Sequence, residues 1–214
     1  MRNFISEDDI EQAILQKLEG DPFQYGILRC DPSPDKRELL PDGTGRSSKK
    51  ECVLPLILRE ALARLNPDIP GEKLEEIARD LCRDFSATDM TATNYKYYNQ
   101  IRNGIKISLR RNGKEDFDFV KLVDFDRPEN NTFTAVSQMW IQGRVYWRRP
   151  DVLIFINGLP MVFVELKNSI VKVEEAYNDN LKNYLRDIPN LFALNQICVL
   201  SNGLETRLGA FNAT

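Results

Sequence analysis

The sequence predicts an α/β protein in which a mixed central sheet is flanked by helices. Two continuous apolar runs, at 152–156 and 161–164, lie on either side of Asn157-Gly158, a pattern typical of two buried strands that meet in a tight turn. An amphipathic helix is predicted well before these strands and another helix directly after them. The resulting αβββαβ order of segments is typical of an α/β sandwich.

Composition describes an ordinary globular chain and excludes several kinds of active site. The 214 residues are 42% hydrophobic and 29% charged, enough for one domain with a substantial core. The chain has no histidine, and its four cysteines form no Cys-x-x-Cys pair, which excludes classical zinc sites and Ser-His or Cys-His catalysis. The net charge of −3 provides no global attraction to nucleic acid, so any DNA contact must be local.

We expect a cytoplasmic protein with no membrane partner. No apolar segment is long enough to cross a bilayer. The N-terminal stretch MRNFISEDDIEQ also lacks the apolar core of a secretory signal.

Helices are predicted through most of the first half of the chain. Ser6 followed by three acids predicts a capped helix that ends at Gly20. The stretch 21–47 is rich in proline and glycine and is predicted to be irregular, with a candidate short strand at 25–30. Further helices are predicted at 48–65, 72–83 and 94–110. The stretch GTGRSSKK lacks the spacing of a phosphate-binding loop, so we predict no nucleotide site there.

Strands are predicted to dominate the second half. Alternating polar and apolar residues predict strands at 117–126 and 132–141, which lead through 145–147 into the apolar hairpin. A helix at 173–186, a buried strand at 196–200 and a final strand at 204–211 follow.

The ends of the hairpin carry charged residues that are candidates for a site. Glu165 and Lys167 alternate along one strand and therefore share a face. Asp151 joins them only if it lies opposite Glu165, which requires the numbers of paired residues to sum to 316, an even number. A simple two-residue turn at Asn157-Gly158 gives an odd sum and the wrong face. We therefore predict an odd-length loop or a bulge, with Gly158 at positive φ.

This arrangement predicts a metal site. Two carboxylates, Asp151 and Glu165, together with the main-chain carbonyl of Leu166, form an all-oxygen set suited to Mg²⁺. Lys167 beside them can orient or deprotonate a water and offset charge on a phosphate, which is hydrolytic nuclease chemistry. The alternative on spacing alone is a plain ion pair of Glu165 with Lys167.

The wording of this stretch also resembles a known family. PDVLIFINGLPMVFVELKN, at 150–168, resembles the Pro-Asp…(Asp/Glu)-x-Lys motif and the nuclease domain of the R subunit of type I restriction-modification enzymes. SEDDIEQAILQKL resembles that family's opening helix, ALARLNPDIP the segment before its sheet, and DIPNLFALNQICVLSNGLETRLGAF the strand pair after the site. The resemblance extends over essentially the whole chain.

The resemblance implies a fold and a set of site residues. It implies a restriction-endonuclease-like PD-(D/E)xK core at about 115–214 and a helical N-terminal part at about 1–112, together one endonuclease domain over 1–214. Asp151 and Glu165 would be metal ligands and Lys167 the catalytic lysine. Glu11 would be an auxiliary acid and is a candidate for a further metal ligand. The family's Gln-x-x-x-Tyr motif is matched by Asn180 and Tyr184, so Asn replaces Gln. Local basic residues predicted to contact DNA are Arg148, Arg149 and Lys182.

The expected function is that of a Mg²⁺-dependent endonuclease that cuts double-stranded DNA in concert with an ATP-driven translocase. The implied partners are DNA and the methyltransferase and specificity subunits of the type I complex. ATP would be bound only by motor domains absent from this chain, and the isolated fragment is expected to cleave weakly or not at all. Two alternatives stay open: a stand-alone recombination or repair nuclease, and a non-catalytic docking domain in which Asp151, Glu165 and Lys167 form an internal ion network.

Overall fold

A mixed six-stranded sheet forms the centre of the molecule. The computed structural model describes residues 4–111 and 114–213. The strands run in the order β1-β4-β7-β8-β9-β10, in which β1 with β4 and β8 with β9 are parallel and the other neighbours antiparallel. Their bounds are Gly26–Arg29, Phe133–Ser137, Val152–Ile156, Leu159–Leu166, Ile197–Ser201 and Thr206–Gly209. The predicted mixed sheet flanked by helices is therefore confirmed.

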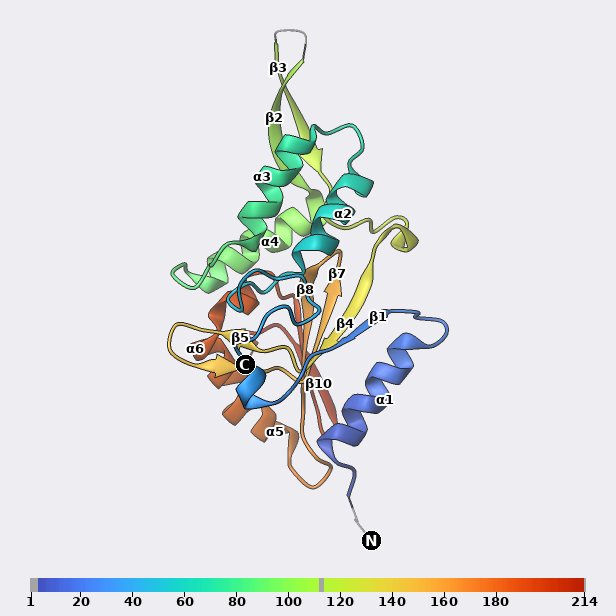
Figure 1. Cartoon of the computed structure of the whole chain (residues 1–214), viewed down its shortest axis with the longest axis vertical. Coiled ribbons are helices and arrows are strands. Elements are labelled where there is room, and N and C mark those ends of the chain that lie inside the picture. Colours follow the sequence, from blue (N-terminus) through green and yellow to red (C-terminus); the bar gives the residue numbers. More distant parts are fainter. Residues whose placement is uncertain (1–3, 112–113, 214) are drawn as a thin grey trace.

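Helices cover both faces of this sheet (Figure 1). Helix α1, Glu7–Glu19, is capped by Ser6 and packs through Ile10 and Leu15 on the face that carries Val152 and Val164. The opposite face is covered by one continuous helical segment made of α5, Val173–Glu175, a π-helical stretch, Ala176–Leu181, and α6, Lys182–Asp187. Alternation along the strands therefore separates the side chains that meet α1 from those that meet the 173–187 helix.

A second core lies at one end of the sheet. Helices α2, Pro55–Leu65, α3, Gly71–Cys82, and α4, Met90–Asn103, pack there with the apolar ends of β7 and β8. Strands β2, Ile105–Arg111, and β3, Lys114–Val120, form a separate hairpin that projects beyond these helices (Figure 1). A small two-stranded ladder joins β5, Ile141–Gln142, to β6, Trp147–Arg148, and short 3₁₀ turns lie at Pro34–Lys36, Pro128–Asn130 and Pro189–Ala193.

Several predicted elements differ from the structure. The helix predicted at 48–65 begins only at Pro55, because the preceding residues are used in tertiary bonds such as that from the Leu54 amide to the Gly158 carbonyl, 2.9 Å. The helix predicted at 94–110 is wrong in its second half. Helix α4 starts earlier, at Met90, and ends at Asn103. Gly104, with a φ of 84°, stops the helix and turns the chain into β2.

The predicted strands are present, but their bounds and their pairing differ from the prediction. Only 117–120 of the predicted strand 117–126 is strand. It is the end of β3, which pairs with β2 and lies outside the central sheet. The predicted strand 132–141 is divided into β4 and β5. The candidate strand at 25–30 is confirmed as β1, and the final strand is shortened to β10. Within 4–111 and 114–213, no helix is long and apolar enough to cross a membrane.

Candidate functional site

The β7–β8 hairpin brings the predicted site residues to one face through a bulge. Asn157 and Gly158 form a two-residue turn with φ of 53° and 80°, and Ile156 pairs with Leu159. The register then shifts next to Ile154, so that Val152 pairs with Val164. Continued by one residue, this register places Asp151 opposite Glu165. The predicted bulge and the positive φ of Gly158 are both confirmed.

Asp151 lies immediately before β7 and is held by main chain from the neighbouring strand. Its Oδ2 accepts a hydrogen bond of 2.7 Å from the Leu166 amide. Burial raises the pKa of Asp151, while this bond and the charge of Lys167 oppose the shift. Since the N–H and C=O of one strand residue point to the same side, the Leu166 carbonyl also lies on the Asp151 side of β8.

Glu165 is the most deeply buried carboxylate of the site, with 2% of the residue exposed. Its Oε1 accepts a hydrogen bond from Asn180, and its Oε2 is buried with no hydrogen-bond partner among the described residues. Burial, and then the neighbouring Asp151, raise the pKa of Glu165. A buried carboxylate oxygen without a donor is costly, and a cation bound there would relieve that cost.

Lys167 is a cationic side chain that lies beside these acids. Its Nζ lies 3.6 Å from Glu165 Oε1 and 3.8 Å from Glu7 Oε1. Its side chain is 16% exposed, so the ammonium group is held between the buried acid and the half-exposed first turn of α1. Glu7 was not predicted as a site residue, because an acid in a first helical turn is ordinarily explained by the helix dipole alone.

The 173–187 helix brings Asn180, in its π-helical stretch, and Tyr184, in α6, close to Glu165. Although Asn180 is shorter than glutamine by one methylene group, its Nδ2 reaches Glu165 Oε1. The Tyr184 hydroxyl donates to the Arg149 carbonyl at 2.9 Å. Burial, followed by the charges of Glu165 and Asp151, raises the pKa of Tyr184 well above its usual range, so the hydroxyl stays protonated. Stretches of π-helix are common at functional sites.

Glu11 reaches the site through a residue that the sequence did not single out. Glu11 is 6% exposed, and its Oε2 accepts a hydrogen bond from Gln138 Nε2, which also lies 3.5 Å from Asp151 Oδ1. Gln138 follows β4 at φ 57°. Burial raises the pKa of Glu11, and the bond from Gln138 opposes that shift. A single glutamine in an alternating strand offers no sequence signal of this role.

Three basic residues predicted to contact DNA have other partners. Arg148 forms an ion pair with the buried Asp187. Arg149 donates to the Pro32 carbonyl and lies over the ring of Trp140. Lys182 donates to Asn178 at 2.9 Å. Their role toward DNA stays a prediction.

The oxygen donors present fit a small hard cation. Within the part of the chain that the structure describes, no group of three or more His, Cys, Asp or Glu side chains is placed to hold a metal ion. The candidate set is therefore two carboxylates and one carbonyl, with Glu165 Oε2 buried and lacking a donor. Hard oxygen ligands with room for water are what Mg²⁺ and Mn²⁺ prefer.

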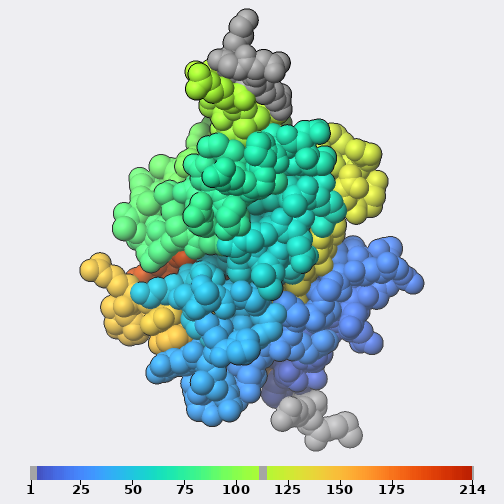
Figure 2. All heavy atoms as spheres, turned by 45° about the horizontal axis from the view of Figure 1, so that its top comes forward, coloured from blue at the N-terminus to red at the C-terminus, as the bar shows by residue number. Residues whose placement is uncertain are grey.

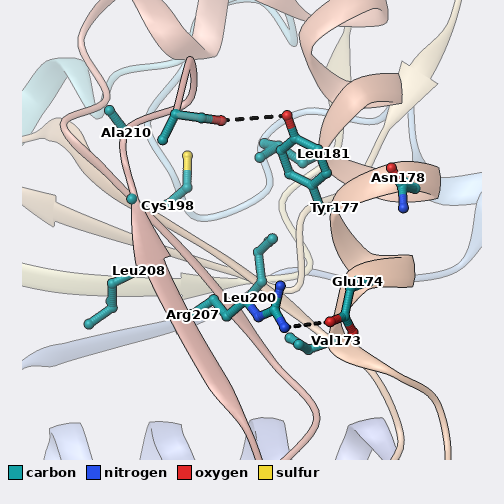
Figure 3. A pocket seen from close by; sticks show the side chains of 12 residues that line it. Val173, Glu174, Tyr177, Asn178, Leu181, Cys198, Leu200, Arg207, Leu208 and Ala210 are labelled. Atoms are coloured by element: carbon teal, nitrogen blue, oxygen red, sulfur yellow. Dashed lines mark hydrogen bonds and ion pairs between the residues drawn. The ribbon is translucent and has the colours of Figure 1, made fainter.

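An apolar cavity of about 300 Å³ lies outside this site. It lies between the 173–187 helix and β10, and its wall includes Val173, Leu181 and Cys198 (Figure 3). Arg207 and Glu174, which form an ion pair, also line it. None of Asp151, Glu165 and Lys167 lines it.

Comparison with known proteins places the chain in a family. The family model described as "Type I restriction enzyme R protein N terminus" matches residues 4–214. The type I restriction enzyme HindI endonuclease subunit of Haemophilus influenzae is 32% identical over 213 residues, which cover 98% of this chain and 19% of that subunit. The putative type I restriction enzyme MjaIXP endonuclease subunit of Methanocaldococcus jannaschii is 31% identical over 94% of this chain, again 19% of the relative. The chain thus spans about a fifth of the length of these relatives. The expected family is confirmed, and the chain belongs to the type I restriction enzyme R protein N-terminal family.

Proposed function

We propose that this chain is the Mg²⁺-dependent endonuclease domain of a type I restriction enzyme R subunit, with a core of the PD-(D/E)xK type. It would hydrolyse phosphodiester bonds of double-stranded DNA. The observation that supports this most directly is the pair of carboxylates, Asp151 and Glu165, set side by side with Lys167 at the end of a buried hairpin. The relatives are endonuclease subunits by name, and this chain matches the family model of the type I restriction enzyme R protein N terminus.

The metal would be held by Asp151, Glu165 and the Leu166 carbonyl. When bound, Mg²⁺ polarises a phosphodiester oxygen and lowers the pKa of a bound water. Asn180 fixes the Glu165 carboxylate through Oε1 and leaves Oε2 free. Lys167 places a positive charge 3.6 Å from Glu165, where it can orient water and offset negative charge on the phosphate.

The rest of the expected system belongs to the same proposal. ATP-driven translocation would be carried by motor domains of the longer subunit. The methyltransferase and specificity subunits would bring the nuclease to DNA, which agrees with the net charge of −3 on this chain.

Metal titration tests the proposed site directly. Isothermal titration with Mn²⁺ is expected to show binding to the parent chain that Asp151→Asn and Glu165→Gln each abolish. Glu129→Gln, at an exposed acid in a 3₁₀ turn, is the control and should leave binding unchanged. Binding that survives in both site variants would contradict the assignment of the ligands.

Restriction by the whole complex tests the chemistry. A complete type I complex whose R subunit carries Lys167→Ala is expected to bind Mn²⁺ and to translocate DNA but to lose cleavage. Retained cleavage would rule out the role given to Lys167. Absence of metal binding and of any effect on cleavage would favour the docking-domain alternative, in which Asp151, Glu165 and Lys167 form an internal ion network.

A further inference from the structure

Gln138 occupies a position that its backbone conformation does not favour. Its φ of 57° lies in the left-handed region, which costs a residue other than glycine or asparagine about 1–2 kcal/mol. The main-chain N–H of Gln138 donates to the main-chain carbonyl of Asp151 at 2.9 Å and so extends the β4–β7 ladder by one residue. Residues held in such conformations concentrate at functional sites, where their side chains are needed.

The side chain of Gln138 lies between two carboxylates. Its Nε2 donates to Glu11 Oε2 and lies 3.5 Å from Asp151 Oδ1. An amide nitrogen carries two hydrogens and can donate one to each acid, whereas the amide oxygen would be repelled there. The orientation of the amide is thus determined by its neighbours. Its Oε1 is left buried with no hydrogen-bond partner among the described residues.

The bonds to Asp151 come from two strands. The Leu166 amide of β8 holds Oδ2, and Gln138, at the end of β4, lies beside Oδ1. Because the two donors bind different oxygens of the carboxylate, together they restrict its rotation more than either does alone. Glu11 in turn anchors Gln138 from α1 on the far side of the sheet end.

We propose that Gln138 is a positioning residue for the metal site, which sets the orientation of Asp151 and through which Glu11 acts. This rests on the proposed function, because it assigns Asp151 to metal binding. It differs from the expectation that Glu11 is itself a ligand. Residues that orient metal ligands by hydrogen bonds typically change metal affinity by about 10- to 100-fold when they are removed.

A double-mutant cycle in Mn²⁺ affinity separates the two roles of Glu11. Gln138→Met, which keeps the length of the side chain but removes the amide, is expected to weaken Mn²⁺ binding by about 10- to 100-fold. Glu11→Gln is expected to weaken binding when Gln138 is present and to have no further effect beside Gln138→Met. Equal effects of Glu11→Gln in both backgrounds, or no effect in either, would contradict the coupling.

Two further variants distinguish a loss of Mn²⁺ binding from a loss of folding. Gln142→Met makes the same change four residues further along the chain and should leave Mn²⁺ affinity unchanged. Gln138→Asn suits the left-handed conformation and keeps an amide, but it is too short to serve both acids. It is expected to fold like the parent and to weaken Mn²⁺ binding as Gln138→Met does.

The outcome distinguishes this inference from the function on which it rests. Retained binding in Gln138→Met together with lost binding in Asp151→Asn would contradict the role of Gln138 alone. Absence of Mn²⁺ binding by the parent would contradict both. In the complete complex, Gln138→Met should raise the Mn²⁺ concentration needed for half-maximal cleavage and leave the rate at saturating metal near that of the parent. A lowered maximal rate with unchanged metal dependence would overturn the inference.

Discussion

The burial of Glu165 between apolar strands lowers the stability of the metal-free protein. Its Oε2 has no donor among the residues described, and both burial and Asp151 disfavour its charged form. The charge of Lys167 and the bond from Asn180 only partly offset this. The charged form of Glu165 therefore destabilises the metal-free fold, a compromise between function and stability that is common in proteins.

The pH dependence of the metal-free protein follows from this raised pKa. Because folded Glu165 binds its proton more tightly than the unfolded chain does, its contribution to stability is full below the unfolded value, about 4.3, and is lost as pH rises through the folded value. Glu165→Gln should remove that part of the slope and, at about pH 8, raise the free energy of unfolding by more than about 1 kcal/mol. Urea denaturation in the presence of a chelator measures both effects.

The control for this prediction is Glu129→Gln, at an exposed acid of the same type. It should follow the pH profile of the parent. A Glu165→Gln variant that is less stable than the parent at the higher pH would show that the charged carboxylate has stabilising partners.

At the scale of single elements, the β7–β8 turn controls the register of the site. Asn157 and Gly158 both adopt left-handed φ, and the bulge beyond them shifts the pairing so that Asp151 faces Glu165. Gly158 also lies against the start of α2. A Cβ on it would lie 2.6 Å from the Leu54 carbonyl oxygen and 2.8 Å from the Leu58 amide nitrogen. The turn thus links the site hairpin to the helical end of the molecule.

Gly158→Ala is expected to destabilise the fold by at least about 2 kcal/mol, because the methyl group adds a clash with α2 backbone to the cost of left-handed φ. Gly43→Ala is a matched control: Gly43 also has a positive φ, 83°, but no atom lies within 4 Å of its added Cβ. Thermal unfolding of both variants separates the clash from the backbone strain. Equal losses in the two would show that packing against α2 contributes nothing.

Sequence patterns predicted those elements whose signals are local. The cap at Ser6, the helix at 72–83 and the even sum of the paired residue numbers in β7–β8 are properties of neighbouring residues, and each is confirmed. The sequence predicts helix where β2 lies, because β2 is stabilised as a strand by its pairing with β3, which the local pattern does not encode.

In the site, too, the sequence predicts the residues whose placement follows from local patterns and misses those whose placement depends on tertiary packing. Asp151, Glu165 and Lys167 are brought together as alternation requires. The contacts of Glu7 and Gln138 depend on where α1 meets the sheet end, which no local pattern encodes.

At the scale of the whole molecule, the irregular segment 31–54 covers part of the surface between α1 and the helices α2, α3 and α4. Figure 2 shows this pale-blue and cyan stretch spread over one face, between the deep-blue N-terminal helix and the green helices. It has little regular structure, and a buried ion cluster attaches it to the core. Arg46 and Lys49 have side chains 0% and 4% exposed and both pair with Asp42. Arg46 also donates to the Trp140 carbonyl at 3.2 Å, just before β5.

Asp42 is therefore expected to be the acid on which this segment most depends. Burial alone would raise its pKa, but Arg46 and the hydrogen bonds from Lys49 and Thr44 outweigh burial and hold the pKa well below its usual range. The stability that it contributes is present above the unfolded value, about 3.9, and is lost as pH falls toward the depressed folded value. Asp42→Asn leaves two buried cations without a counter-charge and should cost about 3–5 kcal/mol of unfolding free energy at neutral pH.

Glu75→Gln is the matched control, because the Arg59–Glu75 pair has similar geometry, 2.8 Å, but side chains 40% and 43% exposed. Exposed pairs contribute only about 0–1 kcal/mol, so this variant should unfold close to the parent. Urea denaturation compares the two losses, and limited proteolysis locates them: Asp42→Asn should expose the 31–54 segment to cleavage before the sheet unfolds. Equal stability losses, or cleavage that starts elsewhere, would show that the apolar contacts of this segment hold it without the buried ions.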